Sequence, residues 1–269
     1  MDKEKNLNEI MDRDKSSLVD GKVIDHRIVI KNSHKEATEK SVITSLKEFV
    51  KKNEKLYYFI IKILSPICPN EGYLKRFIGN HKEGVVLNLG SGNKRIGEHI
   101  INVDLFNYKN VDIVTDLKSM SVKSASADAA LSVAVLEHVD NPEVAIAETA
   151  RVLKKGGECF FTTPFVFGFH ASPYDFTRWT HEGLRKMFER HGLEVIEVGI
   201  QSGPTSAFLC ITIDFLSILL SFGIKQLYEI WTIIFMLILW PFKFMDLILI
   251  KIPFSKVIAA NFYIIARKK

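Results

Sequence analysis

Short apolar runs separated by helix-like segments form the main pattern of this 269-residue chain. Continuous apolar runs bounded by turn residues are typical of strands buried on both faces of a parallel sheet. In chain order the runs are VVLNLG (85–90), HIINVD (99–104), VDIVTD (111–116), ADAALSV (127–133), ECFFTTP (158–164), LEVIEVGI (193–200) and AANFYIIARKK (259–269). We therefore expect these runs to be the strands of one sheet.

Helix signals stand between the strands. NPEVAIAETARVLKKGG (141–157) begins with Asn141 as a candidate N-cap and Pro142 at the first helical position, and Gly156 closes it. THEGLRKMFERHG (180–192) is a second helix stopped by glycine. Strands that alternate with helices predict an α/β fold, with a parallel sheet covered by helices on both faces.

We assign the α/β domain to residues 83–203 and 258–269. The segments outside it have a different pattern of polar and apolar residues. Residues 1–45 are rich in charge, and we expect a polar, partly disordered arm with a strand-like run at 22–30. Residues 46–82 predict a helical lid or cap, and a membrane-surface helix is the second interpretation of their apolar run. Residues 204–257 form a hydrophobic helical insertion before the last strand.

Composition narrows the class of protein. Hydrophobic residues make up 47% and charged residues 25% of the chain, as in ordinary globular proteins. The net charge of +5 is too small to indicate nucleic-acid binding, although it suits an anionic membrane surface. The polar start (1–15) lacks the apolar region of a secretory signal, so we expect a cytoplasmic protein. Cys68, Cys159 and Cys210 are far apart without metal-ligand spacing, which predicts reduced thiols and no metal centre.

The turn GSG (90–92) marks the candidate ligand site. A strand that opens into a glycine-rich turn lets a ligand approach the backbone closely. Asp104 ends the next strand, where its carboxylate can accept hydrogen bonds from a ribose diol. Asp116 ends the third strand, where its carboxylate can accept a hydrogen bond from an adenine amino group, helped by the backbone N–H of Leu117. Because these strand ends lie on the carboxyl edge of the sheet, they predict one nucleoside-binding site.

The ordered series VVLNLGSGN, NVDL, TDL, ADAALSVAVLEHV, RVLKKGG and FFTTPF resembles the class I S-adenosylmethionine-dependent methyltransferases, particularly the bacterial type 11 group. The resemblance covers about residues 83–200 and the last strand. It implies a Rossmann-like, seven-stranded, mostly parallel sheet whose last strand is antiparallel and inserted between its neighbours. It also implies S-adenosyl-L-methionine as the cofactor. The candidate cofactor-binding residues are Asn88, Gly90, Ser91, Gly92, Asp104, Leu105, Asp116, Leu117 and Val133.

Two positions depart from the family pattern. Asn88 stands where the family usually has an acidic residue, and its amide oxygen can still accept a hydrogen bond from the methionine ammonium, without the charge attraction. Lys94 stands where a third glycine is common. A dinucleotide needs that glycine for its pyrophosphate, whereas a sulfonium nucleoside has no phosphate, so the departure argues against a dehydrogenase.

The acceptor side is predicted in the loops above the sheet. Methyl transfer to a hydroxyl needs alignment and a base, and no metal is required. The candidate catalytic residues are His138 and His170, although His138 can equally cap its helix or contact the cofactor. The stretch PFVFGFHASPYDFTRWT (164–180) resembles the H–P–D–R–T stretch of the same family. The candidate substrate contacts are Glu137, Tyr174, Asp175 and Arg178, of which the last two are also spaced to pair with each other.

The insertion lies between the sixth and seventh strands, and both strands belong to one sheet. A single membrane crossing is therefore excluded, and a hairpin pair, a re-entrant loop or a surface-lying segment remains. Asp214, Lys243 and Asp246 interrupt the apolar residues, and the tip SFGIKQ (221–226) is barely polar. These features favour monotopic insertion into one leaflet. The alternative is a cap buried on the enzyme or in a homodimer interface.

Together these patterns predict O-methylation of a small-molecule or lipid-linked, amphipathic acceptor at the inner face of the cell membrane. A glycan or glycolipid hydroxyl and a quinone precursor are the acceptor classes we expect. A catalytically silent, membrane-tethered scaffold that binds S-adenosylmethionine is the alternative from another class. Aminopropyl transfer is a second enzymatic alternative, but it calls for a carboxylate-rich pocket, and the loop 165–180 offers only Asp175.

Overall fold

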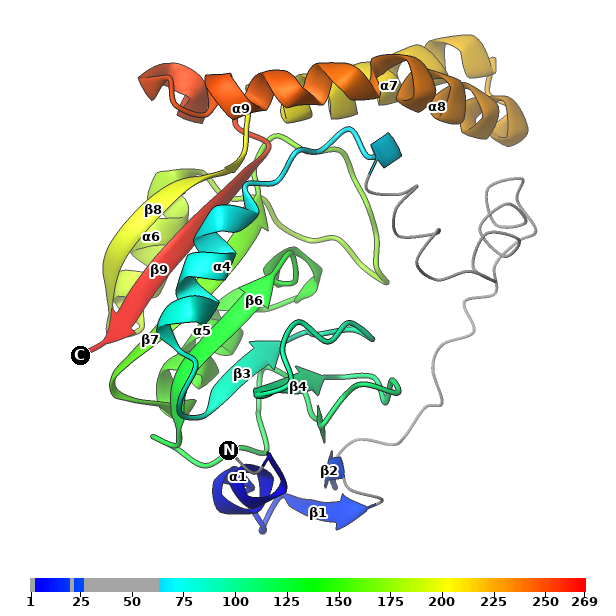
Figure 1. Cartoon of the computed structure of the whole chain (residues 1–269). Coiled ribbons are helices and arrows are strands. Elements are labelled where there is room, and N and C mark those ends of the chain that lie inside the picture. The colour runs from blue at the N-terminus through cyan, green and yellow to red at the C-terminus, as the bar shows by residue number, and fades with distance from the viewer. Residues whose placement is uncertain (1–2, 20–21, 27–62) are drawn as a thin grey trace.

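The computed structural model describes residues 3–19, 22–26 and 63–269 of the chain. Its centre is a nine-stranded sheet with the order β1-β2-β5-β4-β3-β6-β7-β9-β8 (Figure 1). The strands are β1 Ser16–Val19, β2 Lys22–Asp25, β3 Val86–Leu89, β4 Ile100–Asp104, β5 Ile113–Val114, β6 Ala127–Val133, β7 Leu153–Pro164, β8 Leu193–Ser202 and β9 Asn261–Lys268.

In the order of the sheet, the seven strands β5-β4-β3-β6-β7-β9-β8 have the predicted arrangement. β3 pairs in parallel with β4 and β6, and β6 pairs in parallel with β7. β9 lies antiparallel between β7 and β8. β3 and β4 are buried along their whole length, as expected of central strands whose two faces are both covered. The Rossmann-like fold predicted from the sequence is confirmed, with the last strand inserted between its neighbours.

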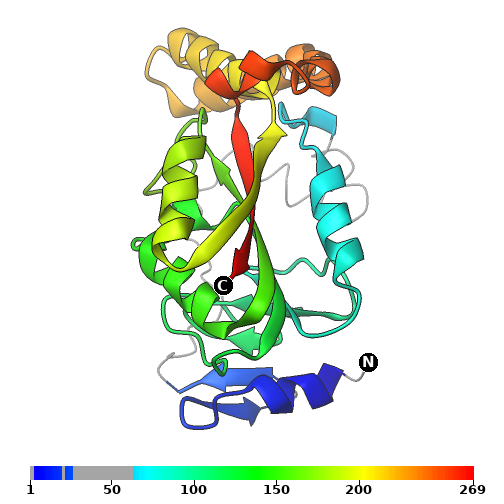
Figure 2. The same cartoon turned by 90° about the vertical axis from the view of Figure 1, so that its left-hand side faces the viewer.

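Helices cover both faces of the sheet (Figures 1 and 2). On one face lies α4 (Glu71–Asn80), where the Tyr73 ring stacks on Tyr263 with the centroids 4.1 Å apart. On the other face lie α5 (Pro142–Val152) and α6 (His181–Arg190), which bury their apolar sides in the larger core cluster. Residues 46–62 of the predicted lid lie outside the described residues.

The predicted ends of α5 need correction. Asn141 stands at the N-cap position, but its side chain makes no capping hydrogen bond. The helix ends at Val152, and β7 begins at once at Leu153 rather than at residue 158. Gly156, with φ +77°, therefore lies inside the first part of β7 instead of closing the helix.

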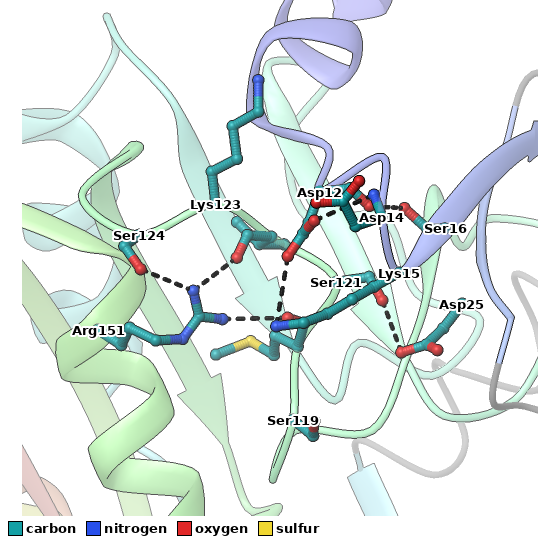
Figure 3. Close-up of polar contacts among 12 residues, drawn as sticks. Asp12, Asp14, Lys15, Ser16, Asp25, Ser119, Ser121, Lys123, Ser124 and Arg151 are labelled. Carbon is teal, nitrogen blue, oxygen red and sulfur yellow. Dashed lines mark hydrogen bonds and ion pairs between the residues drawn. The ribbon is translucent and has the colours of Figure 1, made fainter.

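The N-terminal arm adds two strands beyond the seven expected. After α1 (Lys3–Ile10), the hairpin of β1 and β2 joins the sheet because β2 pairs in parallel with β5. The buried Asp25 carboxylate accepts a hydrogen bond from the Ser121 hydroxyl at 2.6 Å (Figure 3). It also accepts one from the Thr115 hydroxyl at 3.0 Å, and the Asp12 amide donates to the Ser121 carbonyl. The described part of the arm is therefore an integral edge of the sheet.

The insertion forms a flat layer of helices across the end of the domain opposite the arm (Figures 1 and 2). It starts directly after the carboxyl end of β8 and comprises α7 (Pro204–Ser221), α8 (Lys225–Leu239), η2 (Trp240–Met245), α9 (Asp246–Leu249) and η3 (Pro253–Val257). We call residues 204–258 the apolar platform. The turn between α7 and α8 uses two left-handed residues, Phe222 and Gly223.

Candidate active site

The glycine turn after β3 has the backbone that its sequence predicts. The amides of Gly90 and Ser91 donate to the Val103 carbonyl of β4 at 2.8 and 3.1 Å, and φ is +70° at Gly90 and +55° at Gly92. A Cβ at position 90 would lie 2.5 Å from a methyl of Val135, so this glycine permits packing against the segment after β6. A Cβ at position 92 would meet no atom within 4 Å, so the Gly92 backbone borders open space.

Asp104 closes the side of this space at the end of β4. One carboxylate oxygen accepts the Gly92 amide at 2.7 Å and the other accepts the Phe106 amide at 2.9 Å. Burial raises the pKa of the Asp104 carboxyl above its ordinary value, and the backbone hydrogen bonds act in the opposite direction. Each oxygen retains a second acceptor position, which suits the two hydroxyls of a ribose.

Apolar and acidic side chains continue the same edge of the sheet. Leu105 and Val133 are 44% and 42% exposed, which is unusual for aliphatic side chains beside a buried strand end. Asp116 is partly exposed, and its Oδ1 accepts the Lys118 amide at 2.8 Å. Leu117 is largely buried beneath it. Exposed aliphatic groups beside a carboxylate form a surface that suits an adenine ring, so the residues present fit an adenosine-containing cofactor.

Asn88 is less open to a ligand than we expected. Its side chain is buried, and its amide nitrogen donates to Oδ1 of Asn102 on β4 at 3.1 Å. The Asn102 amide in turn donates to the carbonyls of Lys94 at 3.2 Å and Asn110 at 2.8 Å. Asn102 thus holds the glycine turn from behind, a role that sequence reasoning missed. The signal was a polar residue inside the otherwise apolar run HIINVD.

Three acceptor-side residues converge although they come from two loops. Glu137 and His138 belong to η1 (Leu136–His138), which follows β6, and His170 belongs to the loop after β7. Oε1 of Glu137 lies 3.7 Å from Nε2 of His170 and 3.9 Å from Nε2 of His138. The two rings meet edge to face, with centroids 5.2 Å apart. The Glu137 carboxylate raises the pKa of His170, which burial alone would lower.

The carboxylate of Glu137 is the most deeply buried member of this group. Its side chain is 1% exposed, and within the described residues neither oxygen has a hydrogen-bond partner. A buried anion without hydrogen bonds is costly, because desolvation is not offset by specific partners. Within the described residues, the Nε2 atoms of the two histidines and the charge of the Arg178 guanidinium act favourably on this carboxylate.

The other predicted substrate contacts have different roles. Asp175 and Arg178 form a bidentate ion pair, with nitrogen–oxygen distances of 2.5 and 2.6 Å, which lowers the pKa of the Asp175 carboxyl. Asp175 also accepts the His170 amide at 2.8 Å, so the pair orders the loop that carries His170. The Tyr174 side chain is exposed, and it is the Tyr174 carbonyl that contacts His138, at 2.6 Å from Nδ1.

Comparison with known proteins agrees with this geometry. Residues 92–161 match the family model described as "Methyltransferase domain". The strand order is consistent with a Rossmann-like methyltransferase fold, and this match supports S-adenosylmethionine-dependent methyltransferase activity. The match supports S-adenosylmethionine as the methyl donor. Comparison with curated proteins gives no match.

Among solved structures, the chain is similar to a methyltransferase of Mesorhizobium loti at 15% identity and a TM-score of 0.44, over 74% of this chain and 97% of that one. It is similar to the [4+2]-cyclase SpnF at 19% identity and a TM-score of 0.43, over 73% and 80%. It is also similar to phosphoethanolamine N-methyltransferase 2 of Haemonchus contortus, solved with S-adenosyl-L-methionine, at 19% identity and a TM-score of 0.43, over 74% and 52%.

Proposed function

We propose that this methyltransferase O-methylates a lipid-linked or amphipathic acceptor at the cytoplasmic face of a membrane. The observation that carries the proposal is the apolar platform, which lies at the end of the domain where the acceptor-side loop emerges. A glycan or glycolipid hydroxyl and a quinone precursor are the acceptor classes that combine a methylatable hydroxyl with an apolar anchor.

The exposed residues of the platform support a membrane contact. Large apolar side chains on α7 and α8 point to solvent, and Phe222 at the tip is 82% exposed. Two segments of the platform, Pro204–Ser221 and Lys225–Leu249, are long and apolar enough for a bilayer by length and composition. Their flat placement across the end of the sheet favours burial in one leaflet over a crossing (Figure 1).

Three charged residues of the platform, Lys243, Asp246 and Asp214, have polar partners within the protein, whereas Lys225, Lys251 and Lys256 are exposed. Lys243 is buried, and its ammonium donates to the carbonyls of Ile63 at 2.7 Å and Ser65 at 2.9 Å. Asp246 is 1% exposed and accepts hydrogen bonds from the first turn of α7. Asp214 accepts a hydrogen bond from the Tyr228 hydroxyl at 2.9 Å. Insertion of the outer surface would therefore leave these three charges with their partners.

The platform also offers space for an acyl or isoprenoid chain and a direct link to the acceptor loop. A groove of about 390 Å³ is lined almost entirely by apolar side chains, among them Phe208, Leu239 and Phe242. Gly168, next to Phe169 and His170, approaches α7 so closely that a Cβ there would lie 2.8 Å from Oδ2 of Asp214. Contact between the platform and this loop supports an acceptor that reaches the site from the membrane.

The proposed chemistry is a direct displacement. Bound S-adenosylmethionine supplies a methyl group on a positively charged sulfur. The acceptor oxygen forms a bond to the methyl carbon while the carbon–sulfur bond breaks with its electron pair on sulfur, and the hydroxyl proton passes to an imidazole nitrogen of His138 or His170. We place His138 and His170 beside the reacting hydroxyl, Asp104 at the ribose, and the Gly90–Gly92 turn along the methionine portion. Alignment of the two reactants then supplies most of the rate enhancement.

Binding to lipid vesicles tests the membrane contact. Tag-free protein is transferred from detergent to vesicles of phosphatidylcholine and phosphatidylglycerol and floated through a density gradient. The wild type should float. The double variant Phe215→Asp/Phe222→Asp should bind at least about 100-fold more weakly, because each exposed phenylalanine contributes about 1.5–3 kcal/mol on burial. Ile196→Asp, an exposed residue on β8, is the matched control and should float. A wild type that stays in the dense fraction as a soluble dimer would assign the platform to a homodimer interface instead.

Methyl transfer is tested separately. Titration calorimetry with S-adenosylmethionine should show binding that Asp104→Ala abolishes and that Ala at the exposed Asp14 preserves. With lipid extracts as acceptors, release of S-adenosylhomocysteine should follow, and His170→Ala should lower turnover far more than cofactor affinity. Cofactor binding without any product from a broad acceptor set would favour the alternative, a catalytically silent membrane-tethered scaffold.

A further inference from the structure

We propose that Glu137, His138 and His170 bind a divalent transition-metal cation of the zinc class. One ligand atom from each of the three residues lies within 4.8 Å of the other two. Ligands about 2.0–2.2 Å from such an ion stand about 3.0–3.6 Å apart. Glu137 lies 3.7 and 3.9 Å from the two Nε2 atoms, and the two Nε2 atoms lie within 4.8 Å of each other, so binding would draw the two rings together by up to about 1 Å. Two histidines and one carboxylate that leave positions open are a ligand set of catalytic metal sites.

The contacts of Nδ1 define the tautomer of His138 and orient the ring of His170. Nδ1 of His138 faces the Tyr174 carbonyl at 2.6 Å, so this nitrogen carries the proton and Nε2 carries the lone pair. Nδ1 of His170 faces the Gly168 carbonyl at 3.1 Å and the Asp175 carboxylate at 3.5 Å. The Arg178 guanidinium also lies 3.3 Å from this Nδ1, but it donates to the same carbonyl and carboxylate. Both Nε2 atoms are thus directed toward Glu137, and backbone carbonyls orient the rings as in known metal sites.

The buried carboxylate is an independent second observation. Glu137 is 1% exposed, and within the part of the chain that the structure describes neither of its oxygens accepts a hydrogen bond. The two imidazoles and the charge of the Arg178 guanidinium act on this carboxylate without donating a hydrogen bond to either of its oxygens. A divalent cation would supply direct coordination to one oxygen and charge compensation to both. The group therefore has the composition of a metal site and an unsatisfied charge at its centre.

A cation here would act on the acceptor hydroxyl. Nε2 of each histidine would coordinate the cation, and the acceptor oxygen would bind at an open coordination position. Coordination lowers the pKa of a hydroxyl and releases its proton to water, so the oxygen reacts as an alkoxide or phenolate without a histidine base. This role rests on the proposed function for the place of the acceptor, whereas the binding of the ion rests on the three side chains alone.

The test is titration of the tag-free, full-length protein in detergent, after removal of metals with a chelator, with Zn²⁺ and with Co²⁺. We expect one equivalent of ion to bind, with visible Co²⁺ absorption typical of a site of low coordination number and with a rise in the unfolding temperature. Glu137→Gln should weaken binding by at least about 100-fold, because loss of a direct ligand exceeds the 10–100-fold effect of an outer partner. Its metal-free unfolding temperature should equal or exceed that of the wild type, because the variant removes an unpaired buried charge.

Glu143→Gln is the matched control, because Glu143 also faces a histidine, with its Oε2 2.5 Å from Nε2 of His191. Neither Glu143 nor His191 is one of the three proposed metal ligands. This variant should bind Zn²⁺ like the wild type. Absence of binding by wild-type protein that still binds S-adenosylmethionine would overturn the metal site and leave the proposed function intact. Binding that persists in Glu137→Gln would assign the ion to other residues. Metal binding without cofactor binding would overturn the proposed function and leave the metal site.

Discussion

Asp246 ties α9 to the first turn of α7 within the apolar platform, and its replacement by alanine is a direct test of how the platform is held together. Its carboxylate accepts hydrogen bonds from the Thr205 amide at 2.8 Å, the Ser206 amide at 2.9 Å and the Ser206 hydroxyl at 2.6 Å. The Ser206 hydroxyl accepts the Cys68 amide at 3.0 Å, so the network also ties down the chain before α4. A Cβ at Gly203 would lie 2.5 Å from Oδ1 of Asp246, which explains the glycine at this position.

The magnitude follows from the groups that lose a partner. A hydrogen bond to a charged group stabilises a protein by about 1.5–3 kcal/mol. Two buried backbone amides at the start of α7 would lose theirs, while the Ser206 hydroxyl can rotate to another acceptor. We expect a loss of about 3–5 kcal/mol. At about 2–4 °C per kcal/mol for a domain of this size, the unfolding temperature should fall by about 6–20 °C.

The assay is thermal unfolding in detergent followed by tryptophan fluorescence, which Trp231 and Trp240 on the platform make sensitive to this region. The control is Asp14→Ala, which removes an exposed aspartate and should leave the unfolding temperature within about 1 °C of the wild type. Equal unfolding temperatures for Asp246→Ala and the wild type would refute the view that the Asp246 carboxylate anchors α7.

Three further predictions concern the active site. Gly90→Ala should destabilise the fold, as measured by denaturant unfolding, because its Cβ would lie 2.5 Å from Val135; a midpoint like that of the wild type would contradict this. Gly92→Ala should weaken S-adenosylmethionine binding at least tenfold in calorimetry with only about 1 kcal/mol of strain, because the added methyl enters open space at a positive φ. Glu137 raises the pKa of His170 above its ordinary value of 6.5. The interaction between Glu137 and protonated His170 therefore stabilises the fold fully at pH values below 6.5, and this stabilisation is lost as the pH rises through the raised pKa of His170. Glu137→Gln should return the His170 pKa, measured by NMR titration, toward 6.5, and an unchanged pKa would assign the shift to other groups.

Local patterns in the sequence determined the central sheet. Buried strands such as β3 and β6 have both faces covered, so each one is a continuous apolar run that stands out without reference to its neighbours. The Gly90–Gly92 turn and Asp104 could be predicted for a related reason, because the ends of parallel strands share one edge whatever the details of packing. The apolar character of residues 204–257 was equally visible, since composition needs no tertiary partner.

Only the tertiary structure decided which groups meet across long chain separations. Asp246 caps α7 from the far side of the hairpin, and Asn102 holds Asn88 from the neighbouring strand; in both cases the partner could have been any of several polar residues. β2 is short and its run resembles many others, so its pairing with β5 follows from the space at the sheet edge rather than from its sequence. Glu137, by contrast, was predicted as a substrate contact. Its burial beside two imidazoles depends on how two loops pack, and that packing is what gives the carboxylate its chemistry.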